Sequence, residues 1–189
     1  MFHVPLVMAA LLPGAGEGPS GLVGKPAPLL AADIALHGTT APLADLKGKV
    51  VLLHFWAVWC QPCRDSFPAL RDWQNRYGRQ GLQVIGVTRY YQDFAFRDGR
   101  VVLADEKLTA EQERAMLKDF AAHHGLDYRL LLLPGEAGRK TFAEYGAARL
   151  PLTVVLDREG KVRLVKMGAG KGNTEAIERV LRELLPPRD

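Results

Sequence analysis

Cysteine is scarce in this sequence: Cys60 and Cys63 are the only two among 189 residues. One pair makes at most one internal disulfide, and a chain of this length can bury a core without such bonds. A structural zinc site usually needs four cysteine or histidine ligands, but the sequence has no second C-x-x-C and no H-x-x-x-H. The pair therefore predicts redox chemistry rather than a structural role.

Long apolar runs and blocks of one charge are also lacking. Residues 4–12 are apolar but too few to span a bilayer, and no Lys or Arg precedes them. Residues 1–20 therefore fit two interpretations, a flexible leader or a signal-like segment, while residues 21–189 are expected to form one domain. The 25 basic and 21 acidic residues are spread along the chain, which argues against a nucleic-acid partner. Membrane contact is expected only through an N-terminal anchor.

The cysteines follow an apolar run, Val50 to Trp56, that is rich in β-branched and aromatic residues. Such a short run predicts a buried parallel strand. The residues after Cys63 predict a helix over 64–77, because apolar side chains recur at helical spacing; they are Phe67, Leu70, Trp73 and Tyr77. The two cysteines are thus expected at a strand-to-helix junction.

This junction favours a reactive thiolate, because the N–H groups at the start of a helix stabilise negative charge. We expect Cys60 to be the exposed nucleophile and Cys63 to resolve the mixed disulfide that it forms. Pro62 suits the first turn of a helix, where its missing N–H is not needed. Gln61 lies between the cysteines and is counted among the supporting residues.

The octet Trp56–Cys63 (WAVWCQPC) resembles the thioredoxin active site, and the other landmarks between residues 21 and 185 resemble the TlpA/ResA-like thiol-disulfide oxidoreductases of bacterial envelopes. The resemblance implies an α/β thioredoxin-like fold, with a mixed central sheet flanked by helices and an N-terminal β-hairpin over residues 33–43. It also implies a disulfide reductant outside the cytoplasm that needs no cofactor. Its partners would be client proteins with disulfides or thiols and an upstream thiol electron donor.

Three further residues take roles from this resemblance. Leu150 and Pro151 match the pair that carries a cis-proline facing the disulfide, where backbone groups could pair with an extended client segment. The alternative is an ordinary trans proline at the start of a strand. Trp59 would form an apolar shoulder beside Cys60, unless it simply packs in the core.

His54 departs from the family pattern, because thioredoxins carry a buried aspartate two residues before the matching tryptophan. One interpretation is a general base toward Cys63, since burial would keep the imidazole neutral. The other is a core histidine bonded to a backbone carbonyl. Ser66 is a second departure, because ResA-like proteins have a glutamate there, and the adjacent Asp65 lies on a different helical face.

The remaining chain predicts a strand at 81–88, an insert near residues 89–108 and a helix that begins at Thr109 and ends at Gly125. Four aromatic residues of the insert fit a substrate-facing lip or local packing; they are Tyr90, Tyr91, Phe94 and Phe96. Next come a strand at 128–133, a helix at 139–145, an antiparallel hairpin at 152–165 and a final helix. His123 and His124 fit a metal or proton site or favourable placement at a helix C-terminus, and Asn173 or Thr174 is expected to cap the final helix.

Two rival functions also fit parts of the sequence. The first is a soft-metal module in which Cys60, Cys63 and His54 bind Cu(I); tight Cu(I) binding without disulfide reduction would favour it. The second is a peroxidase-like redoxin, which places a threonine a few residues before its reactive cysteine. Residues 56–59 contain no threonine, so this second function is rejected.

Overall fold

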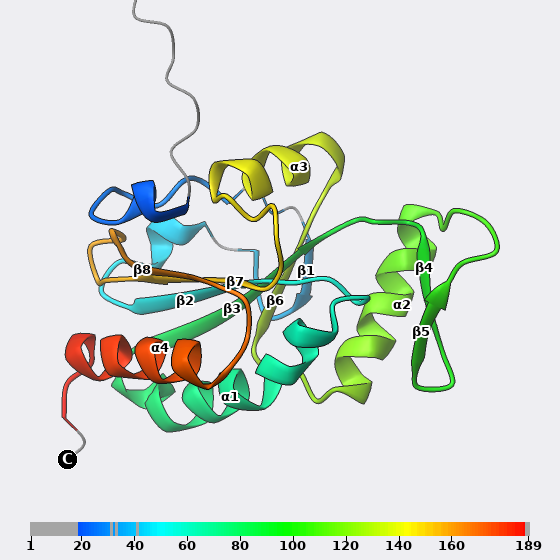
Figure 1. Cartoon of the computed structure of the whole chain (residues 1–189). Helices are drawn as coiled ribbons and strands as arrows, with labels where there is room; N and C mark the ends of the chain where they lie inside the picture. Colours follow the sequence, from blue (N-terminus) through cyan, green and yellow to red (C-terminus); the bar gives the residue numbers. More distant parts are fainter. Residues whose placement is uncertain (1–18, 31, 33, 41, 188–189) are drawn as a thin grey trace, which may run out of the picture.

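A computed structural model describes residues 19–187 except 31, 33 and 41. A six-stranded mixed sheet forms its centre, in the order β1-β6-β3-β2-β7-β8 (Figure 1). The strands are β1 Ile34–His37, β2 Val50–Phe55, β3 Leu82–Arg89, β6 Arg129–Leu133, β7 Leu152–Leu156 and β8 Val162–Met167. β2, β3 and β6 run parallel, while β7, β8 and β1 are antiparallel to their neighbours. The expected thioredoxin-like α/β fold is confirmed.

β2 lies in the middle of this sheet, and all six of its residues are buried. Its side chains alternate between two apolar clusters, as the two-residue period of a strand requires: Val50 and Leu52 on one face, Val51, Leu53 and Phe55 on the other. The continuous apolar run in the sequence therefore reflects a strand covered on both faces.

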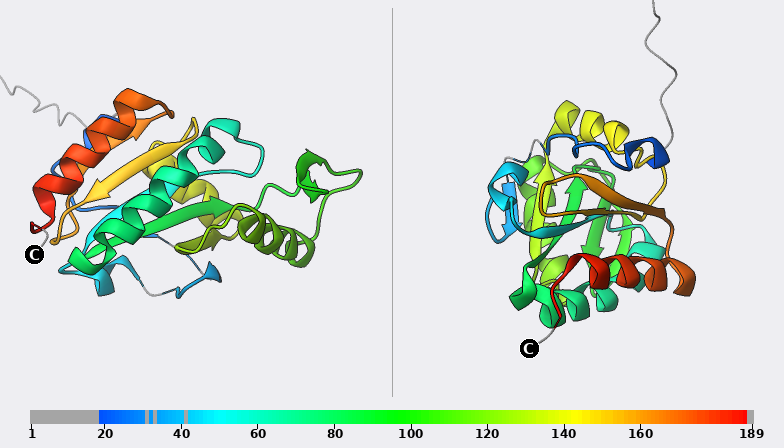
Figure 2. Two further views of the ribbon diagram at one scale, coloured as in Figure 1. Left: turned by 90° about the horizontal axis from the view of Figure 1, so that it is seen from below. Right: turned by 90° about the vertical axis from the view of Figure 1, so that its left-hand side faces the viewer.

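Helices cover both faces of the sheet. On one face α1 (Gln61–Tyr77), α2 (Ala110–His123) and α4 (Lys171–Leu184) contribute to the larger cluster. On the other lie α3 (Gly135–Glu144) and the N-terminal segment, by which we mean the described residues from Leu22 to Leu46. The right-hand view of Figure 2 shows α1 and α4 together below the sheet and α3 above it. Short 3-10 turns lie at Pro19–Leu22, Leu43–Leu46 and Gly78–Gln80.

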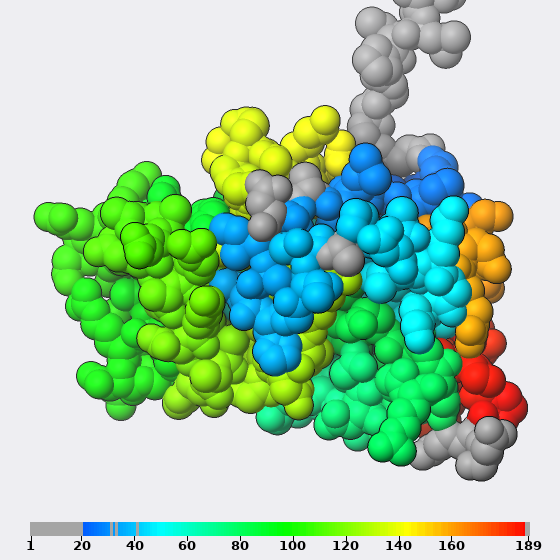
Figure 3. Space-filling view, turned by 180° about the vertical axis from the view of Figure 1, so that it is seen from behind, coloured from blue at the N-terminus to red at the C-terminus, as the bar shows by residue number. Residues whose placement is uncertain are grey.

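The expected N-terminal hairpin is wrong among the described residues. β1 instead extends the main sheet, antiparallel to β6, with Ile34 opposite Leu132. Residues 43–46 form a 3-10 turn rather than a returning strand. The strand that pairs with β1 is β6, almost a hundred residues further along the chain. The turn at Gly38 had instead suggested a partner strand close in sequence. Seen from behind, the N-terminal segment lies across the molecule next to α2 and the insert (Figure 3).

The insert forms the hairpin of this fold. β4 (Phe94–Arg97) and β5 (Arg100–Leu103) pair with each other and not with the main sheet. Asp98 and Gly99 turn the chain with positive φ angles of 51° and 74°, a backbone conformation that glycine and aspartate tolerate well. The hairpin projects beyond α2 at one end of the molecule (Figure 1).

The helix boundaries confirm some expectations and correct others. Thr109 caps α2 in a full capping box with Gln112, as expected. α3 begins at Gly135, four residues earlier than expected. α4 is capped by Gly170 rather than by Asn173 or Thr174, because the Asn173 amide donates to the carbonyls of Met167 and Gly168, both at 2.9 Å, and so holds the preceding turn.

Candidate active site

The two cysteines lie where β2 passes into α1, and they are joined by a disulfide with a Cα–Cα distance of 5.3 Å. Cys60 is the N-cap residue of α1, and its Sγ accepts a hydrogen bond from the backbone N–H of Cys63 at 3.2 Å. Helix N-termini carry N–H groups without intrahelical partners. A thiolate at Cys60 would therefore meet a donor that is already aimed at it.

Cys60 is more enclosed than expected. Only 3% of its surface is exposed, against 0% for Cys63, so the expectation of an exposed nucleophile is wrong for the disulfide form. Both residues belong to the apolar cluster that also contains Val58 and Phe67. The order of accessibility is still the expected one, because Cys60 is the cysteine that keeps a contact with solvent.

The residues between and after the cysteines fix the first turn of α1. Pro62 lies in that turn, where no N–H is required. The Gln61 amide donates to Asp65 at 2.8 Å, and Arg64 donates both to the Gln61 side chain and to the carbonyl of Val58. This exposed network ties the start of the helix to the loop that precedes Cys60.

The Leu150–Pro151 peptide bond is cis, as the resemblance implied. β7 begins directly after it and pairs with β2 so that Leu152 lies opposite Phe55. This register places the Leu150–Pro151 loop beside the end of β2, from which the cysteines emerge. Pro151 is buried, while Leu150 is half-buried and lines a neighbouring cleft.

His54 lies beneath the site with 1% of its surface exposed. Its Nδ1 is 3.1 Å from the hydroxyl oxygen of Thr153, which faces it across the β2–β7 pair. This bond goes to a side chain, whereas the core-histidine interpretation had named a backbone carbonyl as the partner. Burial lowers the pKa of His54 to about 3, and the nearby Cys63 backbone opposes this shift in part. The imidazole is therefore neutral at physiological pH.

Trp59 is exposed and contacts the insert. Its ring meets Tyr91 edge to face, with centroids 5.6 Å apart, and lies 6.0 Å from Phe94. Phe96 instead packs on Phe120 of α2, with centroids 5.3 Å apart. The aromatic residues of the insert therefore fall into two groups. Tyr91 and Phe94 border the cysteine loop through Trp59, whereas Phe96 packs locally on α2.

Glu113 is a residue that the sequence analysis missed. It is 2% exposed, and its carboxylate accepts the backbone N–H groups of Tyr91 and Gln92 at 2.8 and 3.0 Å. It thereby holds the loop that places Tyr91 against Trp59. Burial raises the pKa of Glu113, while the two N–H donors oppose the shift. A signal was present, because Glu113 lies on the same helical face as the apolar Met116, Leu117 and Phe120.

The adjacent histidines at the end of α2 pack on aromatic rings. The ring centroid of His124 is 4.3 Å from that of Phe120, and that of His123 is 5.1 Å from that of Phe96. Burial lowers the pKa of His124. Within residues 19–187, apart from the three undescribed positions, no group of three or more His, Cys, Asp or Glu side chains could hold a metal ion.

The fold and the cysteine pair define a thioredoxin-like thiol-disulfide oxidoreductase. Comparison with known proteins places the chain more closely: the model of the AhpC/TSA family matches residues 23–165. The chain belongs to this family. It is 28% identical over 165 residues to the thiol-disulfide oxidoreductase ResA of Bacillus thuringiensis (strain Al Hakam), a match that covers 87% of this chain and 79% of that protein.

Solved structures of thiol-disulfide proteins share this fold. A protein from Chlorobium tepidum, described as a thiol:disulfide interchange protein DsbE, superposes with a TM-score of 0.62 at 32% identity. The match covers 86% of this chain and 97% of that one. An exposed lipoprotein thioredoxin of Streptococcus pneumoniae strain TIGR4 gives a TM-score of 0.58 at 28% identity, covering 83% of this chain and 100% of that one. Across the described part of the chain, none of the helices has the length and apolar character needed to cross a bilayer.

Proposed function

We propose that this thiol-disulfide oxidoreductase reduces disulfides of client proteins outside the cytoplasm, with Cys60 as nucleophile and Cys63 as resolving thiol. The observation that carries these roles is the N-cap position of Cys60, whose sulfur accepts the Cys63 N–H at 3.2 Å. The same donor would stabilise the Cys60 thiolate once the disulfide is reduced. Cys63 lies one turn into the helix and is fully buried, which suits attack on Cys60 rather than on a client.

The proposed reaction has two exchange steps. The Cys60 thiolate attacks one sulfur of the client disulfide, so that a mixed disulfide forms and the other client sulfur leaves as a thiolate. The Cys63 thiolate then attacks the Cys60 sulfur and releases the second client thiolate. Two electrons pass to the client, and the Cys60–Cys63 disulfide is restored. An upstream thiol donor must supply two electrons before the next cycle.

The supporting residues act through position. Gln61 and Pro62 fix the first turn of α1, and Trp59, Leu150 and Pro151 border the cysteine loop where a client segment would lie. We assign His54 to a structural role: it is buried and bonded to Thr153 across the β2–β7 pair, and a pKa of about 3 makes its imidazole too weak a base to take the proton of Cys63 near neutral pH.

Variants of the two cysteines test the assignment. With insulin as client and dithiothreitol as donor, Cys60→Ser should abolish catalysed reduction, because it removes the attacking sulfur. Cys63→Ser should accumulate the mixed disulfide, detectable by non-reducing mass spectrometry. The assignment fails if Cys60→Ser keeps full activity, or if the trapped client is attached to Cys63 in Cys60→Ser and nothing is trapped in Cys63→Ser.

The reduction potential of the cysteine pair decides whether the protein acts as a reductant or as an oxidant. A reductant should have a potential closer to the roughly −270 mV of thioredoxin than to the roughly −120 mV of DsbA. A redox titration of the Cys60–Cys63 pair decides between them, and a potential near the second value would make the chain an oxidant. We also propose that residues 1–20 direct export, the signal-like one of their two interpretations. Fused to a reporter that is active only outside the cytoplasm, they should give an active fusion; an inactive fusion would contradict the proposal.

A further inference from the structure

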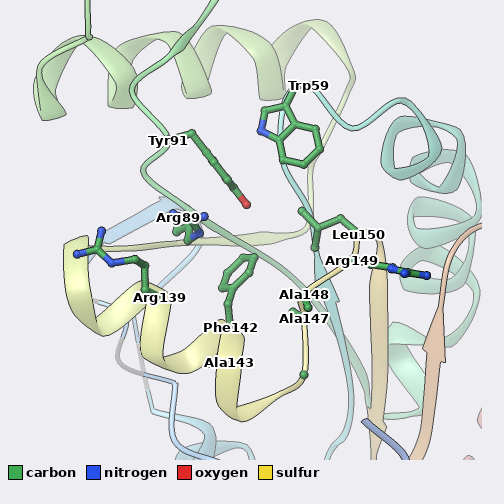
Figure 4. Close-up of a pocket in the computed structure, with 11 residues that line it drawn as sticks. Trp59, Arg89, Tyr91, Arg139, Phe142, Ala143, Ala147, Ala148, Arg149 and Leu150 are labelled. Atoms are coloured by element: carbon green, nitrogen blue, oxygen red, sulfur yellow. The ribbon is translucent and has the colours of Figure 1, made fainter. Parts of the chain in front are cut away.

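A cleft of about 690 Å³ opens beside the cysteine loop (Figure 4). Trp59, which precedes Cys60, and Leu150, which precedes Pro151, form one end of it. Tyr91 of the insert loop and Phe142 of α3 form its apolar walls. A segment bound in this cleft would therefore run past the disulfide.

The charge of the cleft has one sign. Its lining includes Arg89, Arg139 and Arg149 and no aspartate or glutamate. Figure 4 shows Arg89 between Tyr91 and Phe142, with Arg139 on α3 at one end; Arg149 lies at the other end, and its side chain extends away from Tyr91 and Phe142. Arg139 is paired with Glu136 at 2.7 Å. Neither Arg89 nor Arg149 forms an ion pair with a carboxylate of the described residues.

Arg89 is held in place without a compensating carboxylate. Its guanidinium lies over the Tyr91 ring, 4.2 Å from the centroid, and 5.7 Å from that of Phe142. One guanidinium N–H group donates a long hydrogen bond to the Tyr90 carbonyl at 3.4 Å. Glu113 attracts Arg89 electrostatically, but its oxygens are occupied by the N–H groups of Tyr91 and Gln92. The guanidinium is thus ordered and half-exposed, with donors left for a ligand.

On the basis of the proposed function, we propose that this cleft selects client segments that carry an acidic side chain near the reactive cysteine, and that Arg89 is the selecting residue, with Arg149 adding positive charge at the rim. The apolar walls contact the neighbouring side chains of an extended segment, and the Arg89 guanidinium donates hydrogen bonds to its carboxylate. Arginine matches a carboxylate in a bidentate geometry, so the preference should exceed that of a diffuse positive field. Both positions lie outside the C-x-x-C motif.

Two matched peptides test the proposal. Each is a disulfide-linked dimer of one cysteine peptide carrying a self-quenched fluorophore, with glutamate on both sides of the cysteine in one peptide and glutamine in the other. The rate constant for dequenching by the reduced protein is measured for both peptides at low salt. The wild type should reduce the glutamate peptide about fivefold faster, as expected for partly exposed charge pairs, and added salt should shrink this ratio.

The variants locate the effect. Arg89→Gln with Arg149→Gln should bring the ratio close to one, and Arg89→Glu should invert it. Arg89→Lys keeps the charge but loses the bidentate geometry, so it should keep only part of the ratio. Arg179→Gln on α4, on the opposite face of the sheet from α3, is the matched control and should leave the ratio as in the wild type.

Equal rate constants for the two peptides in the wild type overturn the proposal while leaving the reductase function intact. So does a glutamate preference that survives in the double variant. If the wild type reduces neither peptide, the reductase function itself fails.

Discussion

The burial of His54 predicts how stability changes with pH. The pKa of this histidine falls from 6.5 to about 3 in the folded protein because its ring is desolvated. Between these two values the unfolded chain binds a proton that the folded chain does not, so unfolding is favoured as pH falls. The contribution of His54 is fully present above pH 6.5 and is lost progressively between pH 6.5 and about 3.

The magnitude follows from the same two values. Each pH unit below the unfolded pKa costs about 1.4 kcal/mol. His54 should therefore account for a loss of roughly 2 kcal/mol in the free energy of unfolding between pH 7 and pH 5. Carboxylates titrate in this range as well, so the useful quantity is the difference between two proteins rather than the slope of one.

His54→Asn supplies that comparison. The free energy of unfolding is measured by urea titration at pH 7, 6 and 5, with tryptophan fluorescence as the signal. The variant should be less stable than the wild type at pH 7 because it loses the bond to Thr153, but the gap should narrow by roughly 2 kcal/mol at pH 5. Thr153→Val removes the same bond and keeps the buried ring, so its gap should stay constant.

If the free energy of unfolding falls by the same amount in the wild type and in His54→Asn between pH 7 and pH 5, the reasoning is refuted. His54 would then have the same pKa in the folded and the unfolded chain. The same variant tests whether the imidazole takes part in proton transfer. A base with a pKa of about 3 does not hold a proton near neutral pH, so His54→Asn should leave the pH–rate profile of disulfide exchange unchanged; a shifted profile would assign His54 to proton transfer with Cys63.

Two other predictions concern packing around the site. Glu113→Ala leaves the N–H groups of Tyr91 and Gln92 without their acceptor, so it should lower the free energy of unfolding by about 2–4 kcal/mol and speed hydrogen exchange at both amides; unchanged exchange would show that the carboxylate does not hold the loop. Gly86→Ala would place a methyl group 2.6 Å from Leu130 Cδ2 and 3.1 Å from Trp56 Nε1, so a cost of about 1–3 kcal/mol is expected in thermal unfolding, and an unchanged Tm would contradict it.

The sequence determined the features whose causes are local. An apolar run followed by C-x-x-C and helical spacing placed Cys60 and Cys63 at the junction of β2 and α1. Thr109 and Gln112 are three residues apart, so their capping box could be predicted without any partner from elsewhere in the chain. The cis bond before Pro151 came from the resemblance of its surroundings to a family, and the structure confirms it.

Only the tertiary structure decided the features whose partners are distant in sequence. Glu113 meets Tyr91 across 22 residues, and Thr153 meets His54 across 99. The pairing of β1 with β6, the enclosure of Cys60 and the position of Arg89 over Tyr91 depend on how separate elements pack. Periodicity and capping residues specify which elements form, but the apolar surfaces that bury together choose their neighbours. The cysteine pair could therefore be found in the sequence, while the cleft that would select its clients could not.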